Sequence, residues 1–120
     1  MDLKFAGQRV TAQDAGYTVA LVFGAYEVRI ETPFTLRQPG GDLDVTPGET
    51  DLPDLIGRVA TVARADDEGG LRIDFQDGSR VLVAADPDYE AWTVAGPDGF
   101  KVVSEPGGGL AVWSDAHGSD

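Results

Sequence analysis

The densest group of side chains capable of chemistry is a run of carboxylates, Asp86, Asp88 and Glu90, in the segment ADPDYEAW. On an extended backbone alternate residues point to the same side, so these three would form one acidic row. Such a row can bind a hard cation such as calcium, or contact a basic protein surface. Pro87 and Asp88 are typical of a turn, which would scatter the carboxylates. We therefore predict an acidic contact surface and no metal site.

A second acidic segment, Asp66 to Glu68, runs into two glycines and is also typical of a turn. Two aromatic side chains, Tyr89 and Trp113, are suited to be apolar anchors of a protein contact. The predicted partner-binding residues are Asp66, Asp67, Glu68, Asp86, Asp88, Tyr89, Glu90 and Trp113.

Glu90 also permits a different function. It shares strand parity with Trp92, which the pattern assigns to the core, so Glu90 would be buried if the strand extended back to it. A buried carboxylate needs a partner or a raised pKa, and Arg29 and Arg80 are the candidate partners. The alternative prediction is therefore a small-ligand or enzymatic barrel with a pocket near Glu90.

Other catalytic arrangements find little support in the sequence. The single histidine, His117, lies near the C-terminus, and there are no cysteines. Gly107 to Gly109 precede a predicted strand and lack the lysine and hydroxyl of a phosphate-binding loop. We therefore predict no catalytic residues and no cofactor, and expect the protein not to be an enzyme.

Net charge is the compositional feature that departs most from the ordinary. The 120 residues carry a formal charge of −12. Such a field repels nucleic acid and anionic membranes and speeds encounters with cationic partners. The N-terminal residues show no basic segment followed by an apolar run, and no apolar stretch is long enough to span a bilayer. We expect a cytoplasmic protein with a basic protein partner, and no binding to nucleic acid or membrane.

Alternating apolar residues and turn signals predict a mainly β chain. The expected strands are Gln8–Gln13, Tyr17–Phe23, Tyr26–Glu31, Phe34–Arg37, Leu43–Val45, Arg58–Ala65, 71–76, Ser79–Ala84, the two strands within Tyr89–Val103, and Leu110–Trp113. Val59 and Val62 cannot share one face of a regular strand, so a bulge is expected there. Between the halves, Thr50 or Asp51 is positioned to cap a short helix ending at Gly57.

The two halves of the sequence resemble each other. Phe34, Thr35 and Leu36 align with Trp92, Thr93 and Val94, and proline and glycine positions match after them. We interpret this as a duplicated five-stranded antiparallel unit, about 7–48 and 57–113, although alternating β patterns also resemble one another by chance. Each unit is too small to bury much surface alone, so the copies should form one domain, 1–114, as a sandwich or barrel. Residues 115–120 are expected to be a flexible tail.

The C-terminal third resembles a small bacterial family of unknown function. The similarity rests on DPDYEAWTVAGPDG, residues 86–99, and GGGLAVW, residues 107–113. Small acidic proteins of this kind resemble the immunity partners of bacterial toxins. That resemblance implies a protein that neutralises a basic toxin domain.

These observations favour a non-enzymatic acidic protein-binding module, with an immunity protein as its specific form. The ligand-binding or enzymatic barrel is the alternative. A third possibility is a domain that dimerises through an edge strand, so the partner prediction includes both a monomer and a homodimer.

Overall fold

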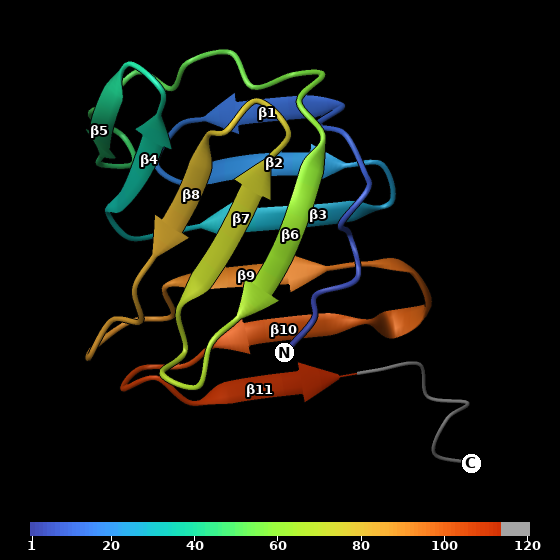
Figure 1. Ribbon diagram of the computed structural model, residues 1–120. Helices are drawn as coiled ribbons and strands as arrows, with labels where there is room; N and C mark the ends of the chain where they lie inside the picture. Colours follow the sequence, from blue (N-terminus) through green and yellow to red (C-terminus); the bar gives the residue numbers. More distant parts are fainter. Residues whose placement is uncertain (114–120) are drawn as a thin grey trace.

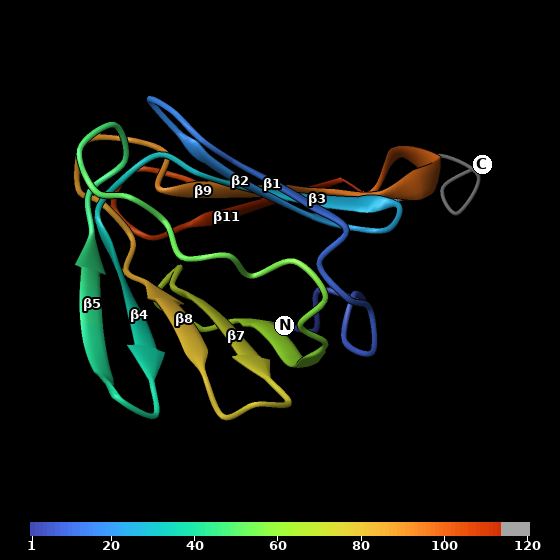
Figure 2. The same cartoon turned by 90° about the horizontal axis from the view of Figure 1, so that it is seen from above.

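The computed structural model describes residues 1–113, which form two antiparallel β-sheets stacked as a sandwich (Figure 1 and Figure 2). The six-stranded sheet has the order β1-β2-β3-β9-β10-β11, formed by Ala12–Ala15, Val19–Phe23, Tyr26–Ile30, Trp92–Ala95, Lys101–Ser104 and Leu110–Trp113. The five-stranded sheet has the order β5-β4-β8-β7-β6, formed by Gly41–Val45, Phe34–Gln38, Arg80–Val83, Leu71–Phe75 and Ala60–Ala65. The predicted mainly β fold is confirmed, and the sandwich rather than the barrel is correct.

Side chains alternate between the core and the outside along several strands, among them β4, β7, β8 and β9. In β7, Leu71, Ile73 and Phe75 are buried while Arg72 is exposed. Trp92 is fully buried, as its pattern predicted. Inward residues of both sheets belong to one hydrophobic cluster, so the two layers share a single core.

The two halves of the chain are arranged alike. β1, β2 and β3 lie in one sheet, and the following hairpin β4-β5 crosses to the other (Figure 1). β6, β7 and β8 repeat this arrangement in the opposite sheet, and β9-β10 cross back. The registers correspond as well, because Val28 pairs with Val94 while Val81 pairs with Leu36. Each half therefore completes the sheet that the other begins, with Phe34 and Trp92 opening the two exchanged hairpins.

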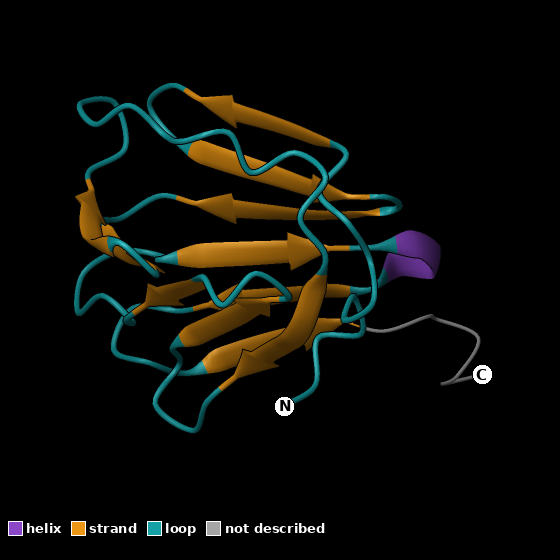
Figure 3. Ribbon diagram, turned by 45° about the horizontal axis from the view of Figure 1, so that its top comes forward, coloured by secondary structure: helices purple, strands orange, loops and turns teal. Residues whose placement is uncertain are grey.

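The predicted helix between the halves is wrong. Residues 46–57 form turns and irregular backbone, and within residues 1–113 the one helix is a 3₁₀ turn, Pro97–Gly99, seen in Figure 3. The Gln13 side chain explains part of this: its Nε2 donates to Pro53 O at 3.1 Å, and Leu55 N donates to its Oε1 at 2.6 Å. These bonds use backbone groups that a two-turn helix would need for itself.

The N-terminal residues differ from the expected strand 8–13, because β1 begins only at Ala12. Residues 1–10 instead run beside β6, with bridges from Asp2 to Arg64 and from Arg9 to Val59. Phe5 is fully buried there. The expected bulge in β6 is confirmed between Ala60 and Val62. Among residues 1–113, no helix has the length and apolar character needed to cross a membrane.

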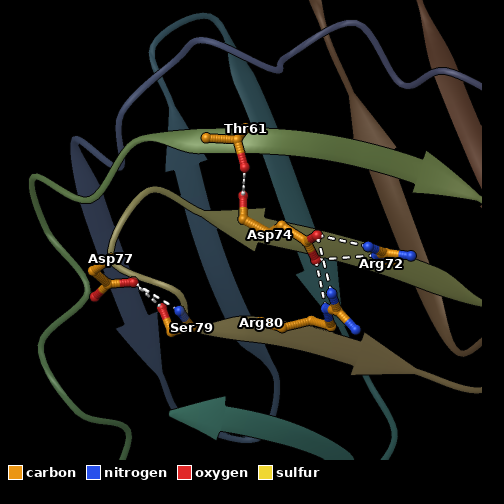
Figure 4. Close-up of polar contacts among 6 residues, drawn as sticks. All are labelled: Thr61, Arg72, Asp74, Asp77, Ser79 and Arg80. Carbon is orange, nitrogen blue, oxygen red and sulfur yellow. Dashed lines mark hydrogen bonds and ion pairs between the residues drawn. The ribbon is translucent and has the colours of Figure 1, made fainter. Parts of the chain in front are cut away.

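An ion cluster on the outer face of the five-stranded sheet is centred on Asp74 (Figure 4). Arg72 donates to both carboxylate oxygens at 3.1 and 2.8 Å, and Arg80 donates at 2.7 and 3.3 Å. Hydrogen bonds from Arg72 hold the pKa of Asp74 below its usual value, and Arg80 acts in the same direction. At the next turn, hydrogen bonds from Ser79 lower the pKa of Asp77.

Replacing Asp74 by Asn should lower the free energy of unfolding at neutral pH by about 1 kcal/mol, since the arginines are partly exposed and screened. Asp74 has a lowered pKa when folded, so its contribution is full above the ordinary Asp pKa of about 3.9 and disappears as pH falls through the folded value. Urea unfolding of wild type and variant should therefore converge in acid. Asp42→Asn is the control, because its 3.6 Å pair with Arg37 is more exposed. Equal losses for both variants, or a constant difference at every pH, would contradict this account.

Candidate functional site

Three loops meet at one end of the sandwich and carry most of the predicted site. They are residues 66–70 between β6 and β7, 85–90 between β8 and β9, and 105–109 between β10 and β11. Figure 1 shows all three at the lower left of the molecule. We call them the acidic loop cluster, because they contain Asp66, Asp67, Glu68, Asp86, Asp88, Glu90 and Glu105.

Backbone contacts join the three loops. Gly69 and Gly108 approach so closely that a Cβ atom on Gly69 would lie 2.5 Å from the Gly108 carbonyl oxygen. Gly69 has φ +85°, in the left-handed region that favours glycine. On the other side, Gly107 N donates to Asp86 O at 2.9 Å. The acidic segments are separate in sequence, and these contacts bring them onto one surface.

The cluster is fastened to the core through the carbonyl oxygen of Gly69. This oxygen accepts hydrogen bonds from Trp92 Nε1 at 2.9 Å and from Ser104 Oγ at 2.8 Å, and both bonds are buried. Trp92 and Ser104 belong to adjacent strands β9 and β10 of the opposite sheet. One loop of the five-stranded sheet is therefore held by two side chains of the six-stranded sheet.

Two of the predicted carboxylates hold their own loops in shape. Asp66 Oδ1 accepts from the backbone N–H groups of Glu68 at 2.9 Å and Gly70 at 2.8 Å. Asp86 Oδ1 likewise accepts from Asp88 N at 2.8 Å and Tyr89 N at 3.1 Å. These are side-chain turns of the kind that Asp favours, so Asp66 and Asp86 have a structural role in addition to their charge.

The other four carboxylates of the prediction project from the cluster. Asp67, Glu68, Asp88 and Glu90 are exposed, and no ion pair within residues 1–113 involves them. No group of three or more acidic, histidine or cysteine side chains in that range has the spacing to hold a metal ion. The arrangement is a set of unpaired negative charges on fixed loops.

Glu90 is not buried beside Trp92, because the strand does not extend back to it. β9 begins at Trp92, and Glu90 lies in the preceding loop with its side chain exposed. Asp86 forms a turn in this segment, so the alternation of buried and exposed side chains in β9 does not extend back to Glu90. The two candidate partners lie elsewhere: Arg29 pairs with Glu27 at 3.0 Å, and Arg80 with Asp74 at 2.7 Å.

The two predicted apolar anchors are both exposed, but they lie apart. Tyr89 is 67% exposed and belongs to the acidic loop cluster. Trp113 is 51% exposed at the far end of β11, paired with Lys101, whose Nζ lies 5.6 Å from the centre of the indole. The structure therefore brings together seven of the eight predicted residues and leaves Trp113 outside.

A cavity of about 690 Å³ adjoins the cluster on the outer face of the five-stranded sheet. Asp66 and Glu68 line its rim, and Arg64 and Arg72, directly opposite each other on β6 and β7, line its wall. Glu90 is not among its lining residues, so the predicted pocket near Glu90 is not this cavity. Sequence reasoning missed the cavity and Glu105, because both depend on which loops and strands become neighbours.

Comparison with known protein families identifies the family to which the chain belongs. A model described as a family of unknown function, DUF6188, matches residues 1–114. No curated protein and no solved structure matches the chain. The match confirms that nearly the whole sequence belongs to a family of unknown function.

Proposed function

The chain belongs to the DUF6188 family, and we propose that it is a non-enzymatic binding module that covers a basic protein partner with its acidic loop cluster. One observation carries this proposal: four exposed carboxylates that make no ion pair within residues 1–113 project from loops that are fixed to the core through Gly69. A surface arranged before binding loses little conformational freedom on association.

The negative charge of the acidic loop cluster indicates that its partner is a cationic protein. With a formal charge of −12, the chain attracts cationic proteins over long distances, and unpaired carboxylates give that attraction a local direction. Tyr89, exposed beside these carboxylates, supplies an aromatic anchor of the kind common in interface hot spots. The cavity next to Asp66 and Glu68 offers room for a side chain of the partner.

The specific partner we propose is a basic toxin domain, which the protein would neutralise by covering it. A toxin and its neutralising protein must be made together, so the protein encoded beside this chain's gene is the first partner to test. It should slow growth when produced alone in bacteria. Growth should recover when the present protein is produced with it.

Neutralising the four projecting carboxylates should weaken this function. The loop variant carries Asp67→Asn, Glu68→Gln, Asp88→Asn and Glu90→Gln. Because steering by charge is lost, its association rate with the neighbouring protein should fall about tenfold or more. Stability should change little, since these side chains make no ion pair in residues 1–113. Surface plasmon resonance measures the rate, and growth rescue measures the function.

A matched control removes the same number of negative charges elsewhere. It carries Asp14→Asn, Glu49→Gln, Asp51→Asn and Asp98→Asn, all outside the acidic loop cluster. This control should rescue growth and associate nearly as fast as wild type. If the neighbouring protein neither binds nor harms growth, the immunity function is contradicted. If both variants lose equal activity, net charge rather than the cluster is responsible.

The cavity favours a second candidate, a small-ligand-binding module. Its wall contains Arg64 and Arg72 over apolar groups such as Leu82, a mixture typical of ligand pockets. A small molecule that raises the melting temperature of wild type and loop variant alike would support this candidate, because Arg64 and Arg72 are unchanged in that variant and Glu68→Gln is its one change among the residues that line the cavity.

A further inference from the structure

The edge of the six-stranded sheet formed by β11 differs from the other sheet edges. β11, Leu110–Trp113, pairs with β10 and with no other strand in the described part of the chain. Its sequence LAVW contains no charge and no proline, and Val112 and Trp113 are 49% and 51% exposed. Figure 1 shows β11 beyond the ends of β6, β7 and β8. An apolar, uncovered edge strand is ready to pair with another strand.

The remaining three edges carry features that discourage pairing. The β6 edge is covered by residues 1–10. β5 presents Asp42 and Asp44, both exposed. β1 contains Asp14, and its Gln13 side chain bonds to the segment between the halves. Charges and covering segments of this kind are common protections of sheet edges, and within residues 1–113 β11 has neither.

The backbone groups free on β11 follow from the hairpin register. Glu105 N donates to Gly109 O at 2.8 Å, which makes these residues a hydrogen-bonded pair. Hydrogen-bonded and non-bonded pairs alternate along antiparallel strands, so Ala111 and Trp113 bond to β10. The N–H and C=O groups of Leu110 and Val112 therefore point away from the sheet.

We propose that a second copy of this chain pairs antiparallel with β11, so that the six-stranded sheets of two copies become continuous. In the register that uses all the free groups, Leu110 of each copy faces Val112 of the other, and Ala111 faces its own equivalent. A two-fold axis makes both Leu110–Val112 pairs identical, as in most homodimers. Because the axis is perpendicular to the sheet, equivalent side chains of the two copies lie on the same face of the continuous sheet.

Charge complementarity is the reason why we propose a second copy, and not another protein, as the partner of β11. In this register Gly109 of one copy faces Trp113 of the other, and Gly109 has no side chain to oppose the indole. The Glu105 carboxylate leans over Gly109, 3.4 Å from where a Cβ would lie. Lys101 leans over Trp113, with its Nζ 5.6 Å from the centre of the indole. The carboxylate of one copy and the ammonium of the other therefore converge on one indole, twice in each dimer.

Sedimentation equilibrium of the full chain tests this proposal. The mass should rise with concentration from 12.6 kDa toward twice that value. Val112→Pro removes an N–H that β10 does not use, so it should weaken dimerisation at least about tenfold without unpairing the hairpin. Ala15→Pro is the matched control on the opposite edge of the same sheet. There Gly16 N donates to Thr18 O, so the Ala15 N–H also points outward, and this variant should dimerise as wild type does.

A charge exchange provides a second test that does not depend on proline. Glu105→Lys should weaken the dimer about tenfold, because Lys101 of the other copy then meets a like charge. Adding Lys101→Glu to it should restore the dimer. A mass of 12.6 kDa at every concentration would overturn the proposal. The partner of β11 would then be a strand of another protein. A dimer unaffected by Val112→Pro, or a charge exchange that fails to restore pairing, would also overturn it.

Discussion

Gly69→Ala should lower the free energy of unfolding by about 3 kcal/mol, because two costs add. The residue has φ +85°, which an L side chain adopts only with strain. Its Cβ would also lie 2.5 Å from the oxygen and 2.8 Å from two carbons of Gly108, all of them backbone atoms that cannot rotate aside. Urea unfolding followed by tryptophan fluorescence measures the loss.

Gly107→Ala separates these two costs. Gly107 has φ +88°, but a Cβ there would meet no atom within 4 Å. It should therefore lose only the backbone part, about 1–2 kcal/mol. In the Gly69 variant, the amide of Gly107, bonded to Asp86 O at 2.9 Å, should also exchange its hydrogen faster, because the loops separate. Equal losses for the two variants would show that the loops are not held by this contact.

Removing both donors to the Gly69 carbonyl should cost more than the two single changes together. Trp92→Phe keeps an aromatic ring but loses the Nε1 bond and some core volume, at a cost of about 2–3 kcal/mol. Ser104→Ala loses the second bond, at about 1 kcal/mol. Either donor alone still satisfies the carbonyl. The double variant leaves it buried and unpaired, so its loss should exceed the sum by about 1 kcal/mol.

The comparison requires four proteins under one unfolding protocol, which together form a double-mutant cycle. Strict additivity would mean that the two bonds act independently and that the carbonyl finds another donor. In that case the fastening of the acidic loop cluster to the core would need a different explanation.

Local patterns in the sequence predicted most of the strands. The alternation of Leu71, Ile73 and Phe75, and the Asp77-Gly78 turn after them, identify a hairpin without any knowledge of neighbours. The bulge in β6 was also readable, because Val59 and Val62 break the period of two. These features depend on residues close in the chain, which is why sequence reasoning reached them.

Features set by side-chain bonds to the backbone were predicted poorly. The helix expected before Gly57 fails because Gln13, on β1, bonds to Pro53 and Leu55. Glu90, whose burial depended on the strand extending back from Trp92, is exposed because Asp86 forms a turn in front of Trp92. In both cases a side chain outside the local pattern takes the backbone groups that the pattern assumed to be free.

The candidate site also has one part that local patterns predicted and one part that they did not. The types of its residues were evident, since carboxylates beside glycine and proline predict exposed turns. That residues 66–68 and 86–90 share one surface follows only from the contact of Gly69 with Gly108 and the bond from Gly107 to Asp86. Trp113 was assigned to the same surface because of its residue type. It lies instead at the C-terminal end of β11, away from the acidic loop cluster.

The salt dependence of association tests the central claim most directly. Rates with the neighbouring protein should be measured between about 0.1 M and 1 M salt, where the Debye length falls from about 10 Å to about 3 Å. We predict a steep fall in rate for wild type and for the control variant, and a much flatter one for the variant lacking Asp67, Glu68, Asp88 and Glu90. Parallel slopes for all three proteins would contradict a binding function of the acidic loop cluster.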